Sequence, residues 1–297
     1  MQDFQLRIAA AWLAACSLML SVGALAQAPA QAPAHETRKI SDNVYVYRHG
    51  GHQAMFIVTP AGVIATDPIG YQHPDTVTDY IAEIKKITQA PIKYVIYSHH
   101  HYDHIAGGKP FKDAGAKFIS HKRAKERLAV LKDPHTILPD ETMGAKRVIK
   151  LGGTTLELHY VGLNHSDSTI VMLLPKEKVL FAVDFLPVGQ VPGRGMIDFF
   201  PLEAEGAIQR VLKLDWNTLI PGHPGVGGRF GTKADVQDQL TFLQDASAAV
   251  KVEAQAGKCW EPAEKEVKLP KYASWPGYEA NLPFVLRRYC ALWGRGT

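Results

Sequence analysis

The sequence predicts an α+β protein in which two β-sheets face each other and helices cover their outer sides. Short apolar strands fill two separate stretches, residues 43–68 and 145–184, and segments with a helical spacing of apolar side chains follow each stretch. Because each sheet must bury an apolar face against another layer, two strand-rich halves that each end in helices fit a layered sandwich.

The first half begins with three short strands, at residues 43–50, 54–60 and 62–68. Their tight connections contain glycine and proline, which predicts an antiparallel meander. Apolar side chains at helical spacing over residues 74–87 predict a helix, and residues 91–98 predict the buried strand that completes a crossover. The next elements are expected to be a short helix around Phe111, a strand at 116–120, a helix at 122–131 and a polar loop at 134–141.

The second half repeats this style. Its expected strands and helices are strands at 145–153, 154–162, 168–175 and 178–184, a long loop at 185–200, a helix at 202–212, a strand at 216–223 and helices at 232–256 and 281–293. We expect one domain over residues 39–256 and a C-terminal extension, residues 257–297, packed on it.

Length and composition are those of an ordinary globular protein. The chain has 297 residues and 46% hydrophobic content, enough for a substantial core. A formal net charge of +4 is too small to indicate nucleic acid as the main partner. The densest basic run, residues 121–127, lacks the interleaved aromatic side chains of nucleic-acid sites and is interpreted as a solvated helix face.

The first 26 residues are typical of an export signal. One arginine precedes an apolar stretch at residues 8–26, which ends in the small-x-small pattern of a cleavage site. Residues 27–38, rich in proline and alanine, are expected to form a flexible linker. We therefore expect a periplasmic or secreted protein with no membrane span after cleavage. A lipid anchor at Cys16 is the alternative, which the apolar residues after Cys16 disfavour.

Cleavage leaves two cysteines, Cys259 and Cys290. Because exported chains tend to oxidise paired thiols, we expect a disulfide between them. The alternative is a pair of buried free thiols.

Residues 98–108, with the sequence SHHHYDHIAGG, hold the densest cluster of chemically active side chains. In an extended chain, residues two apart point the same way, so His99 and His101 can face one point. Beyond them the chain turns, and Asp103 and His104 can face a second point nearby. Imidazole and carboxylate groups packed at the end of an apolar strand are typical of a zinc site.

Three further ligand candidates follow apolar strands of the second half: His165, Asp184 and His223. Each is a weak signal alone, because an aspartate after a strand is usually a turn residue. Together with the first cluster they complete two metal sites. Asp67 ends the third strand and is interpreted either as a turn residue or as a carboxylate that orients a ligand histidine.

This ordered set of residues resembles the ligand set of the metallo-β-lactamase superfamily over about residues 39–256. The matching positions are His99, His101, Asp103, His104, His165, Asp184 and His223, with Asp67 at the position of the family's aspartate beside the ligands. The resemblance implies a four-layer αβ/βα sandwich with the metals at one edge of both sheets. It also implies two zinc ions: the first held by His99, His101 and His165, the second by Asp103, His104 and His223, with Asp184 bridging.

The implied chemistry is hydrolysis. Two metals about 3.5–4 Å apart share a hydroxide of lowered pKa, which attacks a carbonyl or phosphoryl centre. Asp103 is the candidate catalytic residue that holds the proton or passes it to the leaving group. We therefore expect a zinc-dependent hydrolase that cleaves an ester, lactone or amide-type bond of a small-molecule substrate.

β-Lactam antibiotics are the alternative substrates. The resemblance implies that true β-lactamases of the family carry cysteine or serine at the bridging position, where this chain has Asp184. Some of them carry a lysine where this chain has Pro187. Lactonases do carry the bridging aspartate. A mononuclear iron sulfur dioxygenase is a further alternative. A non-catalytic zinc-binding protein is disfavoured, because a structural zinc site is usually closed.

The pocket walls are expected to come from the loops that follow Asp67 and residue 188. The candidate pocket residues are Tyr71, Arg194, Phe199 and Phe200. Arg194 could bind a substrate carboxylate, although a solvated side chain is the simpler interpretation, and the same holds for His52.

Overall fold

The described fold begins with an edge strand. A computed structural model describes residues 35–297, and the export signal predicted at residues 1–26 and the linker residues up to 34 lie outside this range. Strand β1 (His35–Lys39) pairs antiparallel with β2 (Val44–His49). The predicted linker, residues 27–38, is therefore wrong for residues 35–38, because backbone hydrogen bonds to β2 hold a segment that is polar in composition.

The first sheet has seven strands in sequence order, β1 to β7. Beyond β2 these are β3 (His52–Thr59), β4 (Gly62–Thr66), β5 (Ile92–Ile96), β6 (Lys117–His121) and β7 (Glu141–Met143). Pairing is antiparallel from β1 to β4, which confirms the predicted meander, and parallel from β4 to β7.

Three helices cover the outer face of this sheet: α1 (Asp75–Ile87), α3 (Lys109–Asp113) and α4 (Lys122–Leu131). On α1, Val77 and Tyr80 are buried on the same side of the helix. They share a core with outward-facing side chains of the strands, such as Phe56 of β3. The predicted helices at 74–87 and 122–131 are confirmed, because their apolar side chains find this face of the sheet.

The second sheet has five strands in the order β12-β11-β10-β9-β8. They are β8 (Lys146–Leu151), β9 (Thr154–Tyr160), β10 (Ile170–Leu174), β11 (Val179–Ala182) and β12 (Thr218–Pro221). β8 to β11 are antiparallel, whereas β12 returns parallel to β11 after helix α5 (Pro201–Leu212).

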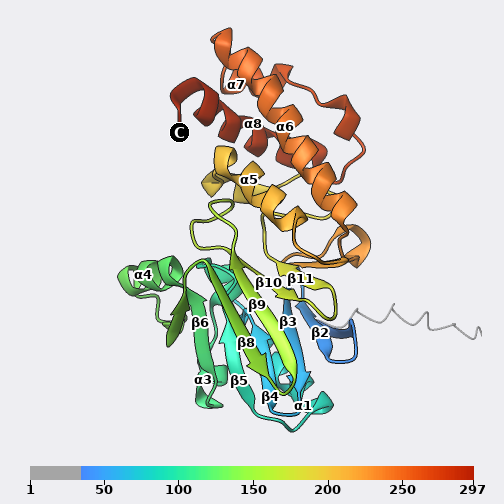
Figure 1. The fold of residues 1–297 in the computed structure, drawn as a ribbon. Coiled ribbons are helices and arrows are strands. Elements are labelled where there is room, and N and C mark those ends of the chain that lie inside the picture. The colour runs from blue at the N-terminus through green and yellow to red at the C-terminus, as the bar shows by residue number, and fades with distance from the viewer. Residues whose placement is uncertain (1–34) are drawn as a thin grey trace, which may run out of the picture. The chain divides into compact units, whose positions relative to one another are not determined.

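The two sheets face each other across a shared core (Figure 1). In β10, Ile170 and Met172 point into this core, while Val171 and Leu173 point to the outer face beneath helices. This period of two is what a strand covered on both sides requires. The structure is the αβ/βα sandwich of an α+β protein that the sequence predicts.

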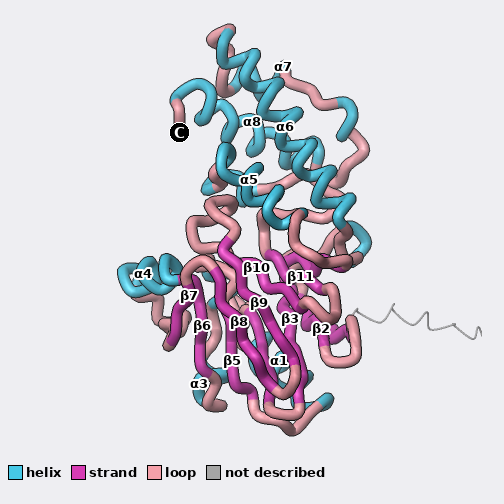
Figure 2. Tube along the Cα trace, viewed as in Figure 1, coloured by secondary structure: helices cyan, strands magenta, loops and turns pink. Residues whose placement is uncertain are grey.

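The helices of the last third lie together beyond the upper ends of β10 and β11 in Figure 2, and they share a core with outward-facing side chains of these strands. They are α6 (Lys233–Gln255), α7 (Glu261–Glu266) and α8 (Tyr278–Arg295). A capping box formed by Thr232 and Asp235 starts α6, in which each side chain satisfies a free backbone N–H. Side chains of α8, among them Val285 and Tyr289, share one core with α5 and α6.

The disulfide predicted between Cys259 and Cys290 is absent, since both are free thiols. The Cys259 thiol instead points to the backbone oxygen of Cys290 at 3.8 Å, and the Cys290 sulfur accepts the Trp260 N–H at 3.2 Å. Each sulfur thus has a hydrogen-bonding partner of its own in the helical layer.

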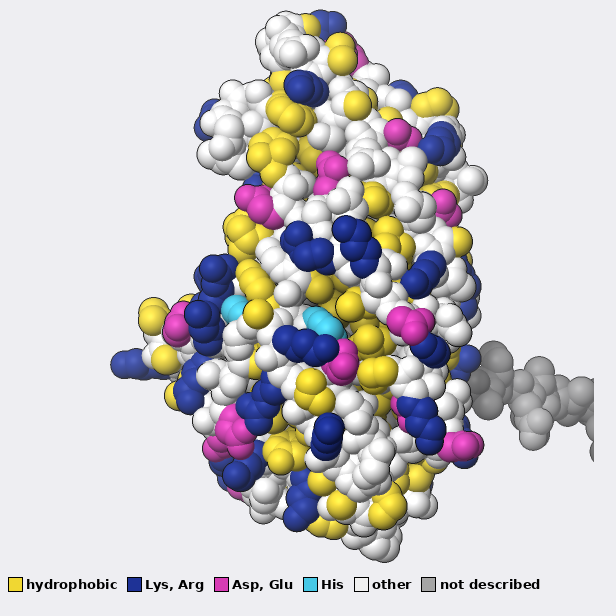
Figure 3. Space-filling view, in the orientation of Figure 1, with side chains coloured by type: hydrophobic (Ala, Val, Ile, Leu, Met, Phe, Trp, Pro, Cys, Tyr) yellow, Lys and Arg dark blue, Asp and Glu magenta, His cyan; other side chains and the backbone are white. Residues whose placement is uncertain are grey.

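Among residues 35–297, no helix is long and apolar enough to cross a membrane. On the face shown in Figure 3, lysine and arginine side chains are interspersed with acidic and hydrophobic ones rather than gathered in one stripe.

Candidate metal centre

Strand β5 carries the first four ligand candidates to the edge of the first sheet. His99 follows the strand and is fully buried, and His101 is the N-cap of α2 (Tyr102–Ile105), a single helical turn. Asp103 and His104 lie within this turn, where the sequence predicts a change from strand to loop. Because the turn is helical, their side chains can reach a point different from that of the two preceding histidines.

The remaining three candidates come from the second sheet and reach the same edge. His165 lies between β9 and β10, Asp184 follows β11, and His223 follows β12. Asp184 has a φ of +70°, a left-handed conformation that aspartate tolerates better than most residues. A Cβ on Gly222 would lie 2.5 Å from Val183 Cγ1, so glycine is needed for the His223 loop to approach.

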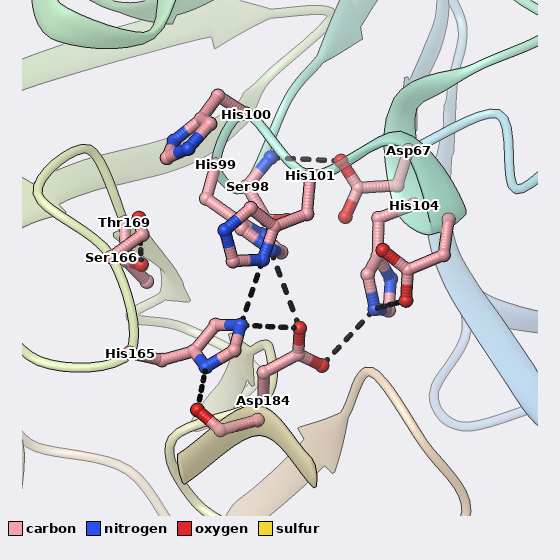
Figure 4. Close-up of polar contacts among 12 residues, drawn as sticks. Asp67, Ser98, His99, His100, His101, His104, His165, Ser166, Thr169 and Asp184 are labelled. Atoms are coloured by element: carbon pink, nitrogen blue, oxygen red, sulfur yellow. Dashed lines mark hydrogen bonds and ion pairs between the residues drawn. The ribbon is translucent and has the colours of Figure 1, made fainter. Parts of the chain in front are cut away.

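The structure brings all seven predicted ligands together in two groups. In the first, His99, His101, His165 and Asp184 each offer an atom within 4.8 Å of the others, and His101 Nδ1 lies 2.8 Å from His165 Nε2. His100 points away from them (Figure 4), where its Nδ1 contacts the Ser168 hydroxyl at 2.8 Å.

The second group consists of His52, Asp103, His104 and His223. Asp184 lies between the two groups (Figure 4). Its Oδ2 is 3.3 Å from His99 Nε2 and 3.2 Å from His165 Nε2. Its Oδ1 is 3.0 Å from His104 Nε2 and 3.2 Å from His223 Nε2. One carboxylate thus faces both groups at once.

Sequence reasoning does not assign two residues to the metal centre: His52, which it considers only as a possible pocket residue, and Asp198. His52 Nε2 lies 3.3 Å from Asp103 Oδ2, although no motif connects the start of β3 with α2. Asp198 lies in the long loop and its oxygens are 3.1 Å from His101 Nε2 and 3.4 Å from His165 Nδ1. No local sequence signal distinguishes either residue, because each acts across a large separation along the chain.

Asp67 is fully buried beside the centre. Its Oδ1 accepts the backbone N–H of Ser98 at 2.8 Å, so Asp67 fixes the backbone just before His99. In the described part of the chain it makes no hydrogen bond to a histidine ring, although the sequence allows that role as one of two. Burial raises the pKa of Asp67 to about 6, although the nearby His104 acts in the opposite direction.

The electrostatics of the centre are dominated by burial and by Asp184. Burial lowers the pKa of His99 to about 3, so this ring is neutral at physiological pH. Burial also acts to raise the pKa of Asp184, but His104 and His223 hold it well below its usual range. In turn, the Asp184 carboxylate overcomes burial and raises the pKa of His223 to about 9.

The donor atoms fit a metal ion. His99 Nε2, His104 Nε2 and Asp184 Oδ1 are buried and make no hydrogen bond among the described residues, despite their short distances to one another. Buried polar atoms without hydrogen bonds cost free energy unless another partner satisfies them. A divalent ion that accepts imidazole and carboxylate ligands would satisfy these atoms together.

A cavity of about 690 Å³ opens beside the two groups. Of the predicted pocket residues, Arg194 and Phe199 line it, but Tyr71 and Phe200 do not. Phe200 is the N-cap of α5, and its backbone N–H donates to the Asn164 oxygen at 2.7 Å. The side chain of Tyr71, in the loop that follows Asp67, is 44% exposed and lies outside the cavity lining.

Comparison with solved structures supports the fold. A metallo-beta-lactamase from Pontibacter korlensis aligns with a TM-score of 0.62 and 22% identity, over 71% of this chain and 99% of its own. The DIM-1 metallo-beta-lactamase aligns with a TM-score of 0.63 and 18% identity, over 73% of this chain and 100% of its own.

Two curated relatives match part of the sequence. The 2,4-dinitroanisole O-demethylase subunit alpha of Nocardioides sp. (strain JS1661) is 25% identical over 75% of this chain and 66% of its own length. A metallo-beta-lactamase type 2 of Elizabethkingia meningoseptica is 30% identical over 50% of this chain and 61% of its own length. The matches therefore span less than two thirds of these relatives.

The sequence model of the metallo-beta-lactamase superfamily matches residues 43–223, which is more than half of the chain. This region contains every predicted metal ligand, and its end coincides with the last of them, His223. With its histidine and aspartate groups at the edge of an αβ/βα sandwich, the chain belongs to the metallo-beta-lactamase superfamily of metal-dependent hydrolases.

Proposed function

We propose that the protein is a dinuclear zinc hydrolase that cleaves an ester, lactone or amide-type bond of a small molecule. One observation carries this proposal: the two oxygens of Asp184 face two separate groups of histidines, at 3.0–3.3 Å. A carboxylate that reaches two ligand groups at once suits a pair of neighbouring ions.

The donor set supports zinc as the metal. Imidazole and carboxylate ligands without a thiolate suit zinc, whereas calcium and magnesium sites are built from oxygen atoms. The proposed first site is formed by His99, His101 and His165, the second by Asp103, His104 and His223, with Asp184 shared. Bound there, the two ions would lower the pKa of a water molecule and polarise the substrate oxygen.

The position of Asp103 supports its proposed role with the proton of the reaction. Asp103 lines the cavity, and its Oδ2 lies 3.3 Å from His52 Nε2. Burial acts to raise the pKa of Asp103, but the hydrogen bond from His52 and the charge of nearby His104 together hold it below its usual range and keep the carboxylate ionised. The ionised Asp103 can accept a hydrogen bond from the attacking water, and His52, whose side chain is 34% exposed, connects this carboxylate with solvent.

The residues at two positions favour an ester or lactone over a β-lactam. This chain has Asp184 where the β-lactamases of the family carry cysteine or serine, and Pro187 where some of them carry a substrate-binding lysine. Pro187 lines the cavity, so no lysine is available at that place to bind a carboxylate. β-Lactam hydrolysis is the second candidate, because several of the relatives and solved structures carry that name.

The site of action is proposed to be the periplasm or the exterior of the cell. This rests on the charged start, apolar stretch and small-x-small pattern of residues 1–26. N-terminal analysis of the protein from a cell fractionation should find a chain that starts at Gln27; intact protein in the cytoplasm would contradict this.

Metal content and hydrolysis, measured on the same preparation, test the proposal. Elemental analysis should find two zinc ions per chain, as the two ligand groups predict. Turnover should then be compared for a γ-lactone, a p-nitrophenyl ester, a chromogenic cephalosporin and 2,4-dinitroanisole, each with and without a chelator. Chelator-sensitive hydrolysis of the lactone or ester, at higher kcat/KM than the cephalosporin, is the expected result.

Three other outcomes would replace this proposal. Efficient cephalosporin turnover, above about 10⁴ M⁻¹s⁻¹, would favour the β-lactamase. One iron and no zinc per chain would favour a sulfur dioxygenase. Zinc at full occupancy without turnover of any of the four compounds would favour a zinc-binding protein.

A further inference from the structure

The cavity has a wall that lies outside the family match. Gln239 of α6 and Asn281 of α8 line the same cavity as the metal-ligand candidates, yet the match ends at His223. The metal end of the cavity is thus built from the part of the chain shared with the superfamily. The wall formed by α6 and α8 is built from residues beyond the match, so residues that select the substrate are expected in this wall.

Gln239 is unusual among the residues of this wall. It is only 1% exposed, and neither its Oε1 nor its Nε2 makes a hydrogen bond within residues 35–297. Asp184 and Gln239 are the two cavity-lining residues of the described chain that leave a buried side-chain atom without a hydrogen bond. Asp184 belongs to the metal centre, whereas nothing in the proposed chemistry uses Gln239.

The surroundings of Gln239 make these unsatisfied atoms costly. Its neighbours on α6, Val236 and Leu243, are buried and apolar and offer no hydrogen bonds from their side chains. Buried amide groups are normally satisfied, and one that is not marks a place for water or a ligand. Because Gln239 borders the cavity, a molecule in the cavity is the available partner.

The wall around Gln239 is held in place by α8. Asn281 Nδ2 donates to the Val191 oxygen at 3.1 Å, and the Val191 N–H bonds the Pro276 oxygen at 3.1 Å. Arg288 Nε donates to the Phe199 oxygen at 2.5 Å. The long loop between the metal centre and the helices is therefore tied at two points, so the cavity is formed before a substrate enters.

The chemistry of an amide decides which ligand fits. Satisfying both Oε1 and Nε2 takes a group that donates and accepts side by side, such as a primary carboxamide or a lactam. A ketone or a carboxylate only accepts, and would leave Oε1 unsatisfied. The remaining lining is largely apolar, with Phe185, Leu186 and Met196 buried around the cavity.

We propose that Gln239 is a specificity-determining residue that binds a carboxamide or lactam group of the substrate through paired hydrogen bonds, while the apolar lining holds the rest of the molecule. This inference rests on the proposed function, because it concerns a second group of the substrate, separate from the bond that is hydrolysed. It narrows the substrate class to esters, lactones or amides that also carry such a group.

Binding of two matched compounds to the zinc-loaded full-length protein tests the inference. 4-Butylbenzamide donates and accepts, whereas 4-butylacetophenone has nearly the same shape and only accepts. Calorimetry or protein-detected NMR should give tighter binding of the amide by about tenfold, the cost of leaving one buried amide group unsatisfied. In the variant Gln239→Leu this ratio should fall to near one, through weaker amide binding and unchanged or stronger ketone binding.

A matched control separates recognition from general effects on the helix. Gln237→Leu makes the same change at an exposed position of α6 and should keep the tenfold ratio. If Gln239→Leu fails to fold, as judged by its melting curve, Gln239→Met fills the same space and replaces it in the comparison.

The outcomes are distinct from those of the hydrolysis assays. An amide preference that depends on Gln239 supports this inference even if none of the hydrolysis substrates turns over. Equal binding of both compounds, binding of neither, or a preference that survives in Gln239→Leu overturns it and leaves a water-filled wall as the explanation. Hydrolysis that is intact alongside such a result would leave the proposed function standing.

Discussion

The two groups of metal-ligand candidates differ in their exposure to solvent. In the first group, the side chains of His99, His101 and His165 are 0%, 21% and 7% exposed. In the second, His104 is fully buried, but Asp103 and His223 are 38% and 42% exposed. The cavity borders both groups, but an ion in the first group would have less exposed ligands around it than an ion in the second. From this difference in exposure we expect the first group to hold its proposed ion more firmly than the second.

Replacing Asp184, the ligand shared by both groups, should abolish zinc binding in both of them. In Asp184→Ala both groups lose the carboxylate that faces them, so we expect loss of both zinc ions. Hydrolytic kcat/KM should fall on the order of 10³-fold or more, as for loss of a main electrostatic stabiliser. Native mass spectrometry gives the metal count. Asp215→Ala, an exposed aspartate paired with Lys178, is the control and should keep both ions; a fully active Asp184→Ala would exclude the bridging role.

Acid should empty the second group before the first. Zinc binds neutral imidazole, so each histidine with a raised pKa must release a proton. The pKa values of His104 and His223 are raised, that of His223 to about 9, because Asp184 outweighs burial at both. In the first group His165 shows this effect, while burial lowers the pKa of His99 to about 3.

The affinity of the second group should therefore fall more steeply between pH 9 and pH 6. The expected slope is about tenfold per pH unit for each proton displaced. Indicator competition at several pH values measures both constants. Equal slopes for the two zinc ions would contradict the predicted difference.

His52 should matter for the second group alone. His52→Ala removes the partner of Asp103, so zinc affinity of the second group should fall by about 10- to 100-fold, as for other residues that support a ligand. The first zinc should be unaffected in the same titration. His159→Ala, a histidine paired with Glu157 on β9, is the control. A loss at the first site instead would show that the two groups are not independent.

Asp198 should give the smallest effect, on the first group. Its carboxylate contacts the ring nitrogens of His101 and His165 that point away from the proposed metal. In Asp198→Asn the side chain keeps its shape and one acceptor, so we expect about a tenfold loss of affinity at the first site. Titration with zinc gives the two constants separately. An unchanged first site would mean that Asp198 is only a wall of the cavity.

The sequence alone determined the regular elements and the predicted ligands. Strands and long helices follow the apolar pattern of neighbouring residues, which is why α1 and α4 appear where they are expected. The seven ligand candidates stand at strand ends and keep the order of the superfamily. Short elements such as β7 and α2 are not predicted from the apolar pattern, because three or four residues are too few to show a period.

Tertiary structure decided everything that depends on contacts between distant segments. It placed His52 beside Asp103, Asp198 beside His101, and Gln239 in the wall of the cavity. It also left Cys259 and Cys290 as free thiols, although the sequence favours a bridge. The physical reason is common to these cases: sequence pattern records which face of an element is buried, but not which side chain of another element meets it there.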